Sequence, residues 1–517
     1  MGIRTGAWYW EYYVGALDGG GAQLPGILQG PGNSAASFYP GSDNNDNFYG
    51  ISWWNGGNTY GAVPNGGTEG AALATSVGTF SAGDIIGFAA DIPNGTLKFY
   101  KNGTLTITVT GIGTALDWVP VFCCWNTTEW GVVNFGQTGT FANAGVTAGG
   151  NSDANGYGNF KYSVPSGYLA LCSKNLSDPT IAKPTDHFNP IIYTGNGSTQ
   201  SISGVGFQPD LVWIKNRSAA DDHKLTDAVR GATKEIESNT DAAEATNADG
   251  LTSFASDGFA LGDDDEYNTN TENYVSWNWL ANGSGSTNDD GATDSTVSVN
   301  TTAGFSIVTF TMPSSGQTTF GHGLGVAPDL IITRPRADVG NWLVWAKPPM
   351  DSTDDYLQLQ TNAAQGSYST VWGAAVPTSS VFGATVGGVA SASSTAVAYC
   401  FASVEGYSKV GTYVGNNNVE GTFVYTGFRP AFVMAKDVNA TESWNLLDNK
   451  RNAYNPVTLP VWADLTSVEG AYGGSGAIDF LSNGFKLRAT NGTINGSTNT
   501  WVYLAFAESP FKYANAR

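Results

Sequence analysis

An internal repeat constrains this chain more than any other feature of its 517 residues. Three Gly-x-x-Pro turns, at Pro209, Pro328 and Pro430, each lead into an apolar, β-branched run. Each run ends in a basic residue: Lys215, Arg334 or Lys436. Proline fixes φ and cannot donate to a ladder, so it belongs at the start of a strand. The repeat therefore predicts three copies of one module that contains a buried strand.

Other positions recur with the same spacing. Pro209 and Pro430 lie 221 residues apart, and the same shift maps Asp227 to Asp448 and Arg230 to Arg451. We interpret each Asp/Arg pair as an internal salt bridge that recurs because the fold recurs. Another shared slot, which we expect to hold a flat, partly buried ring, contains His223, Trp342 and Trp444.

Each copy closes with a hydrophobic strand, and these strands start at Tyr274, Ala396 and Trp501. Agreement of an opening strand, a middle pair and a closing strand in the same order is difficult to obtain by chance. We expect three homologous β-sandwich modules, the last with a carboxyl-terminal tail, at residues 185–281, 302–404 and 405–517.

Composition predicts an all-β protein. Charged residues make up only 13% of the chain, aromatic residues make up 12%, and there are 67 glycines. Few charges leave little for long amphipathic helices to display, whereas short strands with tight turns need glycine and aromatic residues. The one plausible helix covers residues 233–245, and residues 281–300 read as a polar linker. Two-residue hairpin turns are expected at Asn196-Gly197, Asp257-Gly258 and Asn483-Gly484.

Charge and hydropathy exclude two classes of partner. The formal net charge of −21 would repel a phosphate backbone, so we expect no nucleic-acid partner. The first ten residues show no signal peptide, and no stretch of 18 apolar residues occurs, so we expect no membrane insertion. The chain should be made in a cytoplasm.

No residue pattern points to catalysis, and we expect no catalytic residue, no metal and no cofactor. His187, His223 and His322 lack metal-ligand spacing, and the four cysteines form no CxxC pair. The acidic run at residues 263–266 reads as a solvated loop. A calcium ion there is the alternative, although the run lacks the alternating DxDxDG spacing.

Aromatic clusters in Gly- and Asn-rich stretches are the better functional clue. Exposed rings beside amide and hydroxyl groups can stack on a sugar face and bind its hydroxyls; the alternative is that these rings fill the sandwich core. The candidate ligand-binding residues are Trp53, Trp54, Asn58, Tyr60, Trp125 and Trp130.

Four amino-terminal blocks resemble a SPRY domain. They are GAWYWE at residues 6–11, FSAGDIIG at 80–87, DIPNGTLKFYKNG at 91–103 and VNFG at 133–136. The resemblance implies a bent, concanavalin-like two-sheet sandwich within residues 1–180, followed by a trailing segment. It also implies recognition of partners through loops at one end, and no shared catalytic residues.

The chain after His187 resembles a group of uncharacterised virion proteins of marine tailed phages. The segments that carry the resemblance are residues 206–217, 404–409 and 504–517. It implies a structural protein on the exterior of a virion, whose partners are other virion proteins.

Three functions from different classes stay open. The first is a tail or head appendage of the fibre type that contacts host surface glycans through the loop aromatics. The second is a decoration protein that stabilises the capsid shell. The third is a glycan-degrading tailspike, which would need a placed pair of carboxylates. We expect a homo-oligomer and favour a trimer.

Overall fold

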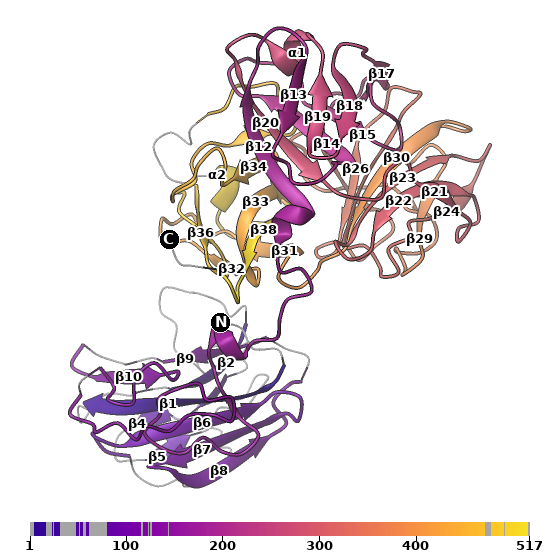
Figure 1. Ribbon diagram of the computed structural model, residues 1–517. Coiled ribbons are helices and arrows are strands. Elements are labelled where there is room, and N and C mark those ends of the chain that lie inside the picture. Colours follow the sequence, from indigo (N-terminus) through magenta and orange to yellow (C-terminus); the bar gives the residue numbers. More distant parts are fainter. Residues whose placement is uncertain are drawn as a thin grey trace. The chain divides into compact units, whose positions relative to one another are not determined.

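The computed structural model describes residues 5–16, 23, 25–30, 48–50, 52–54, 58–60, 80–114, 117–122, 124, 127–142, 144–470, 477–490 and 492–514. The chain divides into two compact units, unit 1 at residues 1–178 and unit 2 at residues 179–517. In both units nearly all the regular secondary structure is strand, so the predicted all-β class is confirmed (Figure 1). No helix among these residues is long and apolar enough to cross a membrane.

Unit 1 is organised around one sheet, antiparallel except for its shortest strand, β11. Its strand order is β10 (Trp130–Asn134), β1 (Ala7–Ala16), β6 (Ile85–Asp91), β7 (Thr96–Lys101) and β8 (Thr104–Thr110), with β11 (Leu169–Ala170) beside β1. Alternate residues of β1 point to opposite faces. Trp8, Trp10 and Tyr12 therefore enter the sandwich core, whereas Tyr9 packs on the other face against Phe160.

The sandwich has smaller partner sheets and a covering segment. The smaller sheets are β3 (Phe48–Gly50), β2 (Gly26–Gly30) and β9 (Asp117–Val121), and the pair β4 (Ser52–Trp54) and β5 (Asn58–Tyr60). The trailing segment, which includes η1 (Ser173–Asn175), places Phe160, Tyr168 and Ala170 over the outer face of the main sheet.

Unit 2 contains one main sheet in each of three modules. Module 1 has β12 (Phe188–Thr194), β20 (Asn273–Trp279), β14 (Leu211–Asn216) and β15 (Lys224–Asp227) in that order, after η2 (Pro184–Asp186). Module 2 has the same order in β23 (Phe305–Thr311), β30 (Thr395–Phe401), β25 (Leu330–Pro335) and β26 (Leu343–Ala346). Module 3 repeats it in β31 (Ser408–Val414), β38 (Thr500–Pro510), β33 (Phe428–Asp437) and β34 (Asn445–Asp448).

Short strands extend these sheets. The module 2 sheet continues through β27 (Asp355–Gln358) and β28 (Gly366–Ser367) at one edge, and the module 3 sheet through β35 (Val461–Trp462). A second, smaller sheet accompanies each module. These sheets are β13 (Gln200–Ser203), β19 (Gly258–Leu261) and β18 (Leu251–Ala255); β24 (Gln317–Gly321) and β29 (Val381–Thr385); and β32 (Phe423–Tyr425), β37 (Gly484–Leu487) and β36 (Ile478–Leu481).

Two expected local structures are absent from the described residues. The helix expected at residues 233–245 is wrong, because β16 (Lys234–Glu235) pairs there with β17 (Ala245–Thr246). The described α-helices are instead α1 (Asp265–Asn268) and α2 (Gly492–Asn495), of four residues each. The expected linker at residues 281–300 is also wrong: β21 (Ser286–Asn288) and β22 (Ser295–Asn300) add to the free edge of β23.

Two of the three hairpin predictions are confirmed. Asp257 and Asn483 lie in the turns of true hairpins, β18–β19 and β36–β37. The prediction at Asn196-Gly197 is wrong, because β12 and β13 on either side of it pair in different sheets. The chain there crosses from one sheet of the sandwich to the other.

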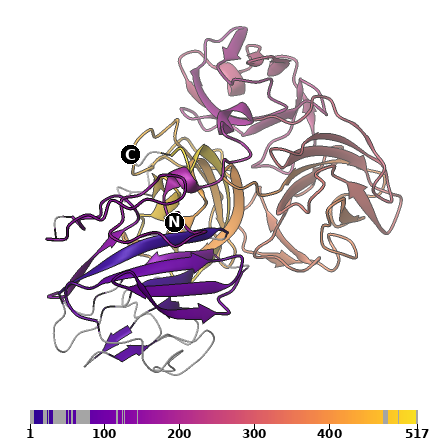
Figure 2. The same ribbon diagram turned by 60° about the horizontal axis from the view of Figure 1, so that its bottom comes forward.

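The three modules share one core around a common axis. Trp279, Phe401 and Phe506 occupy the same position of the three closing strands. Their ring centroids form a nearly equilateral triangle, with separations of 6.4, 6.0 and 5.9 Å. The modules appear as three lobes in Figure 2. A cavity of only about 10 Å³ with an apolar lining remains at the centre, so the unit is a filled ring.

Candidate functional site

The structure brings part of the predicted aromatic cluster together through its backbone. Trp53 and Trp54 belong to β4, and Asn58 and Tyr60 belong to β5. These strands pair antiparallel, with Trp54 opposite Asn58. The side chains of these four residues lie outside the described part of the structure, as does the whole of Trp125.

Trp130 is the predicted residue whose side chain the structure describes, and it is 45% exposed. It begins β10 and pairs with Ala16 across a β-bulge in β1. A Cβ atom added to Gly15 would lie 2.2 Å from the indole ring, so the ring rests on the glycine backbone. Any larger residue at position 15 would lift the ring from the strand.

The surroundings of Trp130 hold it in place. Its ring lies 6.0 Å from that of Tyr13, which in turn packs 5.7 Å from Phe141. The buried Gln23 amide donates to the carbonyls of Ala16 (2.6 Å) and Trp130 (3.1 Å). The result is a preorganised, exposed aromatic surface, which suits stacking on a flat apolar ligand face. We call Trp130 and Tyr13 the Trp130 surface.

A buried carboxylate, Glu11, attaches the trailing segment beside this surface. Glu11 accepts hydrogen bonds from the backbone N–H groups of Lys161 (2.9 Å) and Tyr162 (2.8 Å) and from Tyr9 Oη (3.2 Å). Burial raises the pKa of Glu11, and these donors oppose the shift. With its oxygens engaged, the carboxylate serves to hold the segment against the sheet.

In unit 2, the repeated ring slot closes the circle of modules. Trp342 Nε1 of module 2 donates to the Glu237 carbonyl of module 1 (2.7 Å). Trp444 Nε1 of module 3 donates to the Gln358 carbonyl of module 2 (2.8 Å). Each of these rings is fully buried, although we had expected partial burial.

His223 of module 1 completes this circle. Its Nδ1 accepts from Trp213 Nε1 (2.9 Å), so the proton of the neutral imidazole is on Nε2. Nε2 then donates to the Trp462 carbonyl of module 3 (2.9 Å). Burial lowers the pKa of His223 well below its ordinary value, which keeps the ring neutral. The three equivalent rings therefore each cross one seam: Trp342 binds module 2 to module 1, Trp444 binds module 3 to module 2, and His223 binds module 1 to module 3.

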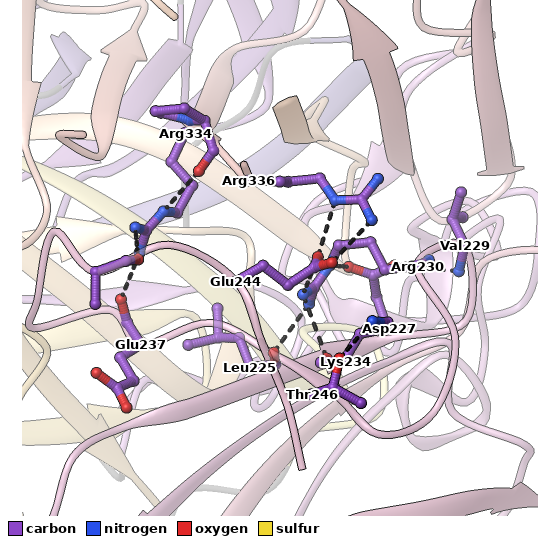
Figure 3. A network of polar contacts seen from close by, with 12 residues as sticks. Leu225, Asp227, Val229, Arg230, Lys234, Glu237, Glu244, Thr246, Arg334 and Arg336 are labelled. Atoms are coloured by element: carbon purple, nitrogen blue, oxygen red, sulfur yellow. Dashed lines mark hydrogen bonds and ion pairs between the residues drawn. The ribbon is translucent and has the colours of Figure 1, made fainter. Parts of the chain in front are cut away.

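The predicted Asp227–Arg230 salt bridge is confirmed at 2.5 Å, with both side chains fully buried. It also reaches into module 2, because Tyr399 Oη donates to Asp227 Oδ2 (2.8 Å). Burial alone would lower the pKa of Arg230, but the Asp227 carboxylate raises it above its ordinary value. Glu244 accepts a hydrogen bond from Arg230 and two from Arg336 of module 2, at 2.8 and 3.0 Å (Figure 3). It therefore links the two arginines across the seam.

The seam between modules 3 and 1 repeats this network. The Asp448–Arg451 salt bridge is confirmed at 2.6 Å and is fully buried. Trp277 Nε1 of module 1 donates to Asp448 Oδ2 (3.2 Å), from the strand position that Tyr399 has in module 2. Glu469 links Arg451 to Arg217 of module 1. In both networks the charged groups bind one another and a residue of the neighbouring module. Because the networks lie inside the seams, they can lock the modules together.

The basic residues that end the opening strands are buried among carbonyl groups. Lys215 donates to the carbonyls of Asn216 (2.8 Å) and, across the seam, Thr466 (3.0 Å). Lys436, by contrast, donates only within module 3 in the hydrogen bonds described, to the carbonyls of Asp437 and Ala440. Burial lowers the pKa of both lysines to about 8.

The acidic run at residues 263–266 contributes to packing. Asp264 accepts from the Glu266 N–H (2.9 Å) and so caps α1, and Glu266 pairs with the buried Lys224 (2.5 Å). Within the described ranges, no group of three His, Cys, Asp or Glu residues is placed to hold a metal ion.

Comparison with known families agrees with this division of the chain. The profile of the family described as "Domain of unknown function (DUF7483)" matches residues 183–510, about 63% of the chain. The chain belongs to the DUF7483 family. The match starts immediately before η2 and ends with β38, so the DUF7483 domain comprises the whole ring of three modules.

A SPRY domain precedes the DUF7483 domain and matches residues 7–138. Among solved structures, the SPRY domain of human HERC1 is 21% identical, over 26% of this chain and 77% of that chain, with a TM-score of 0.20. No curated protein sequence matches the chain. The trailing segment held by Glu11 lies outside both matched regions.

Sequence reasoning missed the residues that lock the DUF7483 ring. The Asp/Arg pairs were found by the repeat, but Tyr399, Trp277, Glu244 and Glu469 were not connected with them. Trp277 and Tyr399 share one position of the closing strand, and this recurrence was the available signal.

Proposed function

We propose that this chain is a structural protein of a tailed-bacteriophage particle, an appendage that contacts host surface glycans through its SPRY domain. The observation that carries the proposal is the Trp130 surface, an exposed ring held rigidly on a SPRY sandwich. A preorganised aromatic ring loses little entropy on binding and can stack on a sugar ring. The SPRY resemblance and the resemblance to virion proteins support the same assignment.

The DUF7483 ring supplies the second half of the proposal. Its modules are interlocked by buried rings and ion pairs, so it can act as a firm body that joins the SPRY domain to the particle. Other virion proteins would bind this body on the virion exterior. The predicted homo-oligomer stays a prediction of this proposal.

Substitution of Trp130 tests the contact with the host. We expect Trp130→Ala to weaken binding of the purified chain to host cells by about tenfold or more, because buried aromatic anchors dominate interfaces. The matched control is Tyr454→Ala, which removes a ring that is 81% exposed on module 3. Binding is measured by flow cytometry with labelled protein, with isolated cell-surface glycan as competitor.

Equal binding by the Trp130→Ala variant and the unaltered chain would contradict the glycan contact. A capsid decoration protein is the second candidate, favoured by the compact ring and by described helices of at most four residues. Antibody labelling of intact particles separates the two, because an appendage and a shell protein are labelled at different places. Absence of the chain from purified particles by mass spectrometry would contradict both.

A further inference from the structure

One edge of the SPRY sheet has few of the features that usually protect an edge strand. β8 is the last strand of its sheet, and within the described residues it pairs only with β7 (Figure 1). Its sequence, TLTITVT, has no charge and no proline, and five of its seven side chains are exposed. An edge strand presents unpaired N–H and C=O groups, and natural proteins usually block such edges with charge, proline or a covering segment.

Comparable edges in the ring are blocked. The free edge of β23 is covered by β22, and β12 carries Pro190 within the strand. At the edge of β31, Ser403 Oγ accepts from the Val410 N–H (3.0 Å), and Val404 bridges to Ser408. In the part of the chain that the structure describes, β8 has no charge, no proline and no covering segment, and its one bulge, at Thr106, leaves residues 107–110 in a regular ladder.

Charge favours β8 as the place where two copies meet. The chain carries a net charge of −21, so two copies repel one another over most of their surface. β8 is neutral, and the adjacent strand β7 contributes Lys98 and Lys101. Contact at this edge therefore brings few negative charges together.

The sequence of β8 is also complementary to itself. A bulge leaves Thr106 without an opposite residue in β7, and from Ile107 to Thr110 the ladder is regular. Antiparallel pairing about Thr108 would place Thr106 opposite Thr110 and Ile107 opposite Val109. Threonine would face threonine and apolar would face apolar, which are favourable cross-strand pairs. Ile107 and Val109 already contact the sandwich core, so the joined sheets would continue it.

We propose that β8 pairs antiparallel with β8 of a second copy, about a twofold axis at Thr108. The two main sheets of the SPRY domains then form one continuous sheet. Such an interface is self-complementary, as twofold interfaces require. It is independent of the Trp130 surface, which lies at the opposite edge strand of the same sheet.

Site-directed disulfide formation tests the register. In the full chain with Cys123, Cys124 and Cys172 replaced by serine, Thr108→Cys places two thiols opposite one another. Directly opposed residues have Cα atoms about 4.5–5.5 Å apart, within the roughly 4.4–6.8 Å that a disulfide spans. The control, Thr104→Cys, would lie roughly 26 Å from its own copy. We expect a covalent dimer for Thr108→Cys on a non-reducing gel, at least about five times as abundant as for the control.

A charge on the edge tests the same contact without a crosslink. We expect Thr108→Lys to weaken dimer formation by about tenfold or more in sedimentation velocity, since an edge lysine disfavours pairing. Thr104→Lys, which adds the same charge outside the paired segment, should leave dimer formation unchanged. Equal crosslinking of the two cysteine variants, or an oligomer that Thr108→Lys does not weaken, would overturn the proposal.

Discussion

Two seams of the ring are locked by buried ion pairs, whereas the third, between modules 2 and 3, has uncharged residues in the corresponding positions; we call it the apolar seam. Modules 1 and 3 carry Asp227–Arg230 and Asp448–Arg451. Pro209 and Pro328 lie 119 residues apart, and this shift maps Asp227 to Ala346 and Arg230 to Pro349 in module 2. Where Trp277 and Tyr399 donate to those aspartates, module 3 has Leu504. The slot of Arg217 and Arg336 likewise holds Val438 in module 3. At the seam between modules 2 and 3, each of these positions holds an uncharged residue.

This difference shows that the polar network behaves as one unit. A buried charge without its partner costs several kcal/mol, so a loss at one position favours loss at the others. The apolar seam also has a short covalent connection, because β30 ends at Phe401 and β31 begins at Ser408. Modules 3 and 1 have no direct chain connection, and their seam carries a complete network. The seam between modules 1 and 2 carries the same network although β20 and β21 connect those modules directly, so the ion pairs occur at seams with and without a chain connection.

Removal of a module from the ring should have the largest effect. The repeat predicts a β-sandwich module at residues 302–404, but the three modules share one core, so isolation of this module would expose apolar surface at both of its seams. We expect residues 302–404 alone to lack a cooperative thermal transition by circular dichroism, whereas residues 179–517 show one. A folded isolated module would mean that the seams join finished domains, and the comparison of seams would lose its force.

Breaking one buried pair should have the next largest effect. Arg230→Met leaves Asp227 buried without its cation, and we expect a loss of about 3–5 kcal/mol in the free energy of unfolding. The triple variant Asp227→Ala, Arg230→Met, Tyr399→Leu copies the apolar seam and should recover most of that loss. Urea denaturation of residues 179–517 measures both. A triple variant no more stable than Arg230→Met would show that the charges are needed for stability itself.

The buried lysines should give a smaller, pH-dependent effect. Burial lowers the folded-state pKa of Lys215 and Lys436 to about 8, whereas an unfolded lysine titrates near 10.4. Between these values the unfolded chain binds more protons, so stability rises with pH. We expect a gain of roughly 1–2 kcal/mol per lysine from pH 8 to 9.5. Thermal unfolding of the Lys215→Met variant should show a flatter rise, and an unchanged slope would contradict the lowered pKa.

The local predictions failed where a segment makes its main contacts with residues that are distant in the sequence. Residues 233–245 contain enough charged and small residues to suggest a helix, but Thr233 has a φ of +69° and Glu237 gives its carbonyl to Trp342, more than 100 positions away. Residues 281–300 are polar, yet the free edge of β23 recruits them as strands. In both places a distant partner outweighs local propensity.

The sequence by itself determined the all-β class, the SPRY domain, the threefold repeat and the paired charges within modules 1 and 3. These features depend on residue types and their spacing along the chain, which can be read directly from the sequence. Only the tertiary structure decided that the modules close into a ring, because the closing contacts join residues far apart, such as His223 and Trp462. It also decided that Trp130 stays exposed while Trp342 and Trp444 are buried. A ring's exposure depends on what the folded chain places over it, and no local pattern records that.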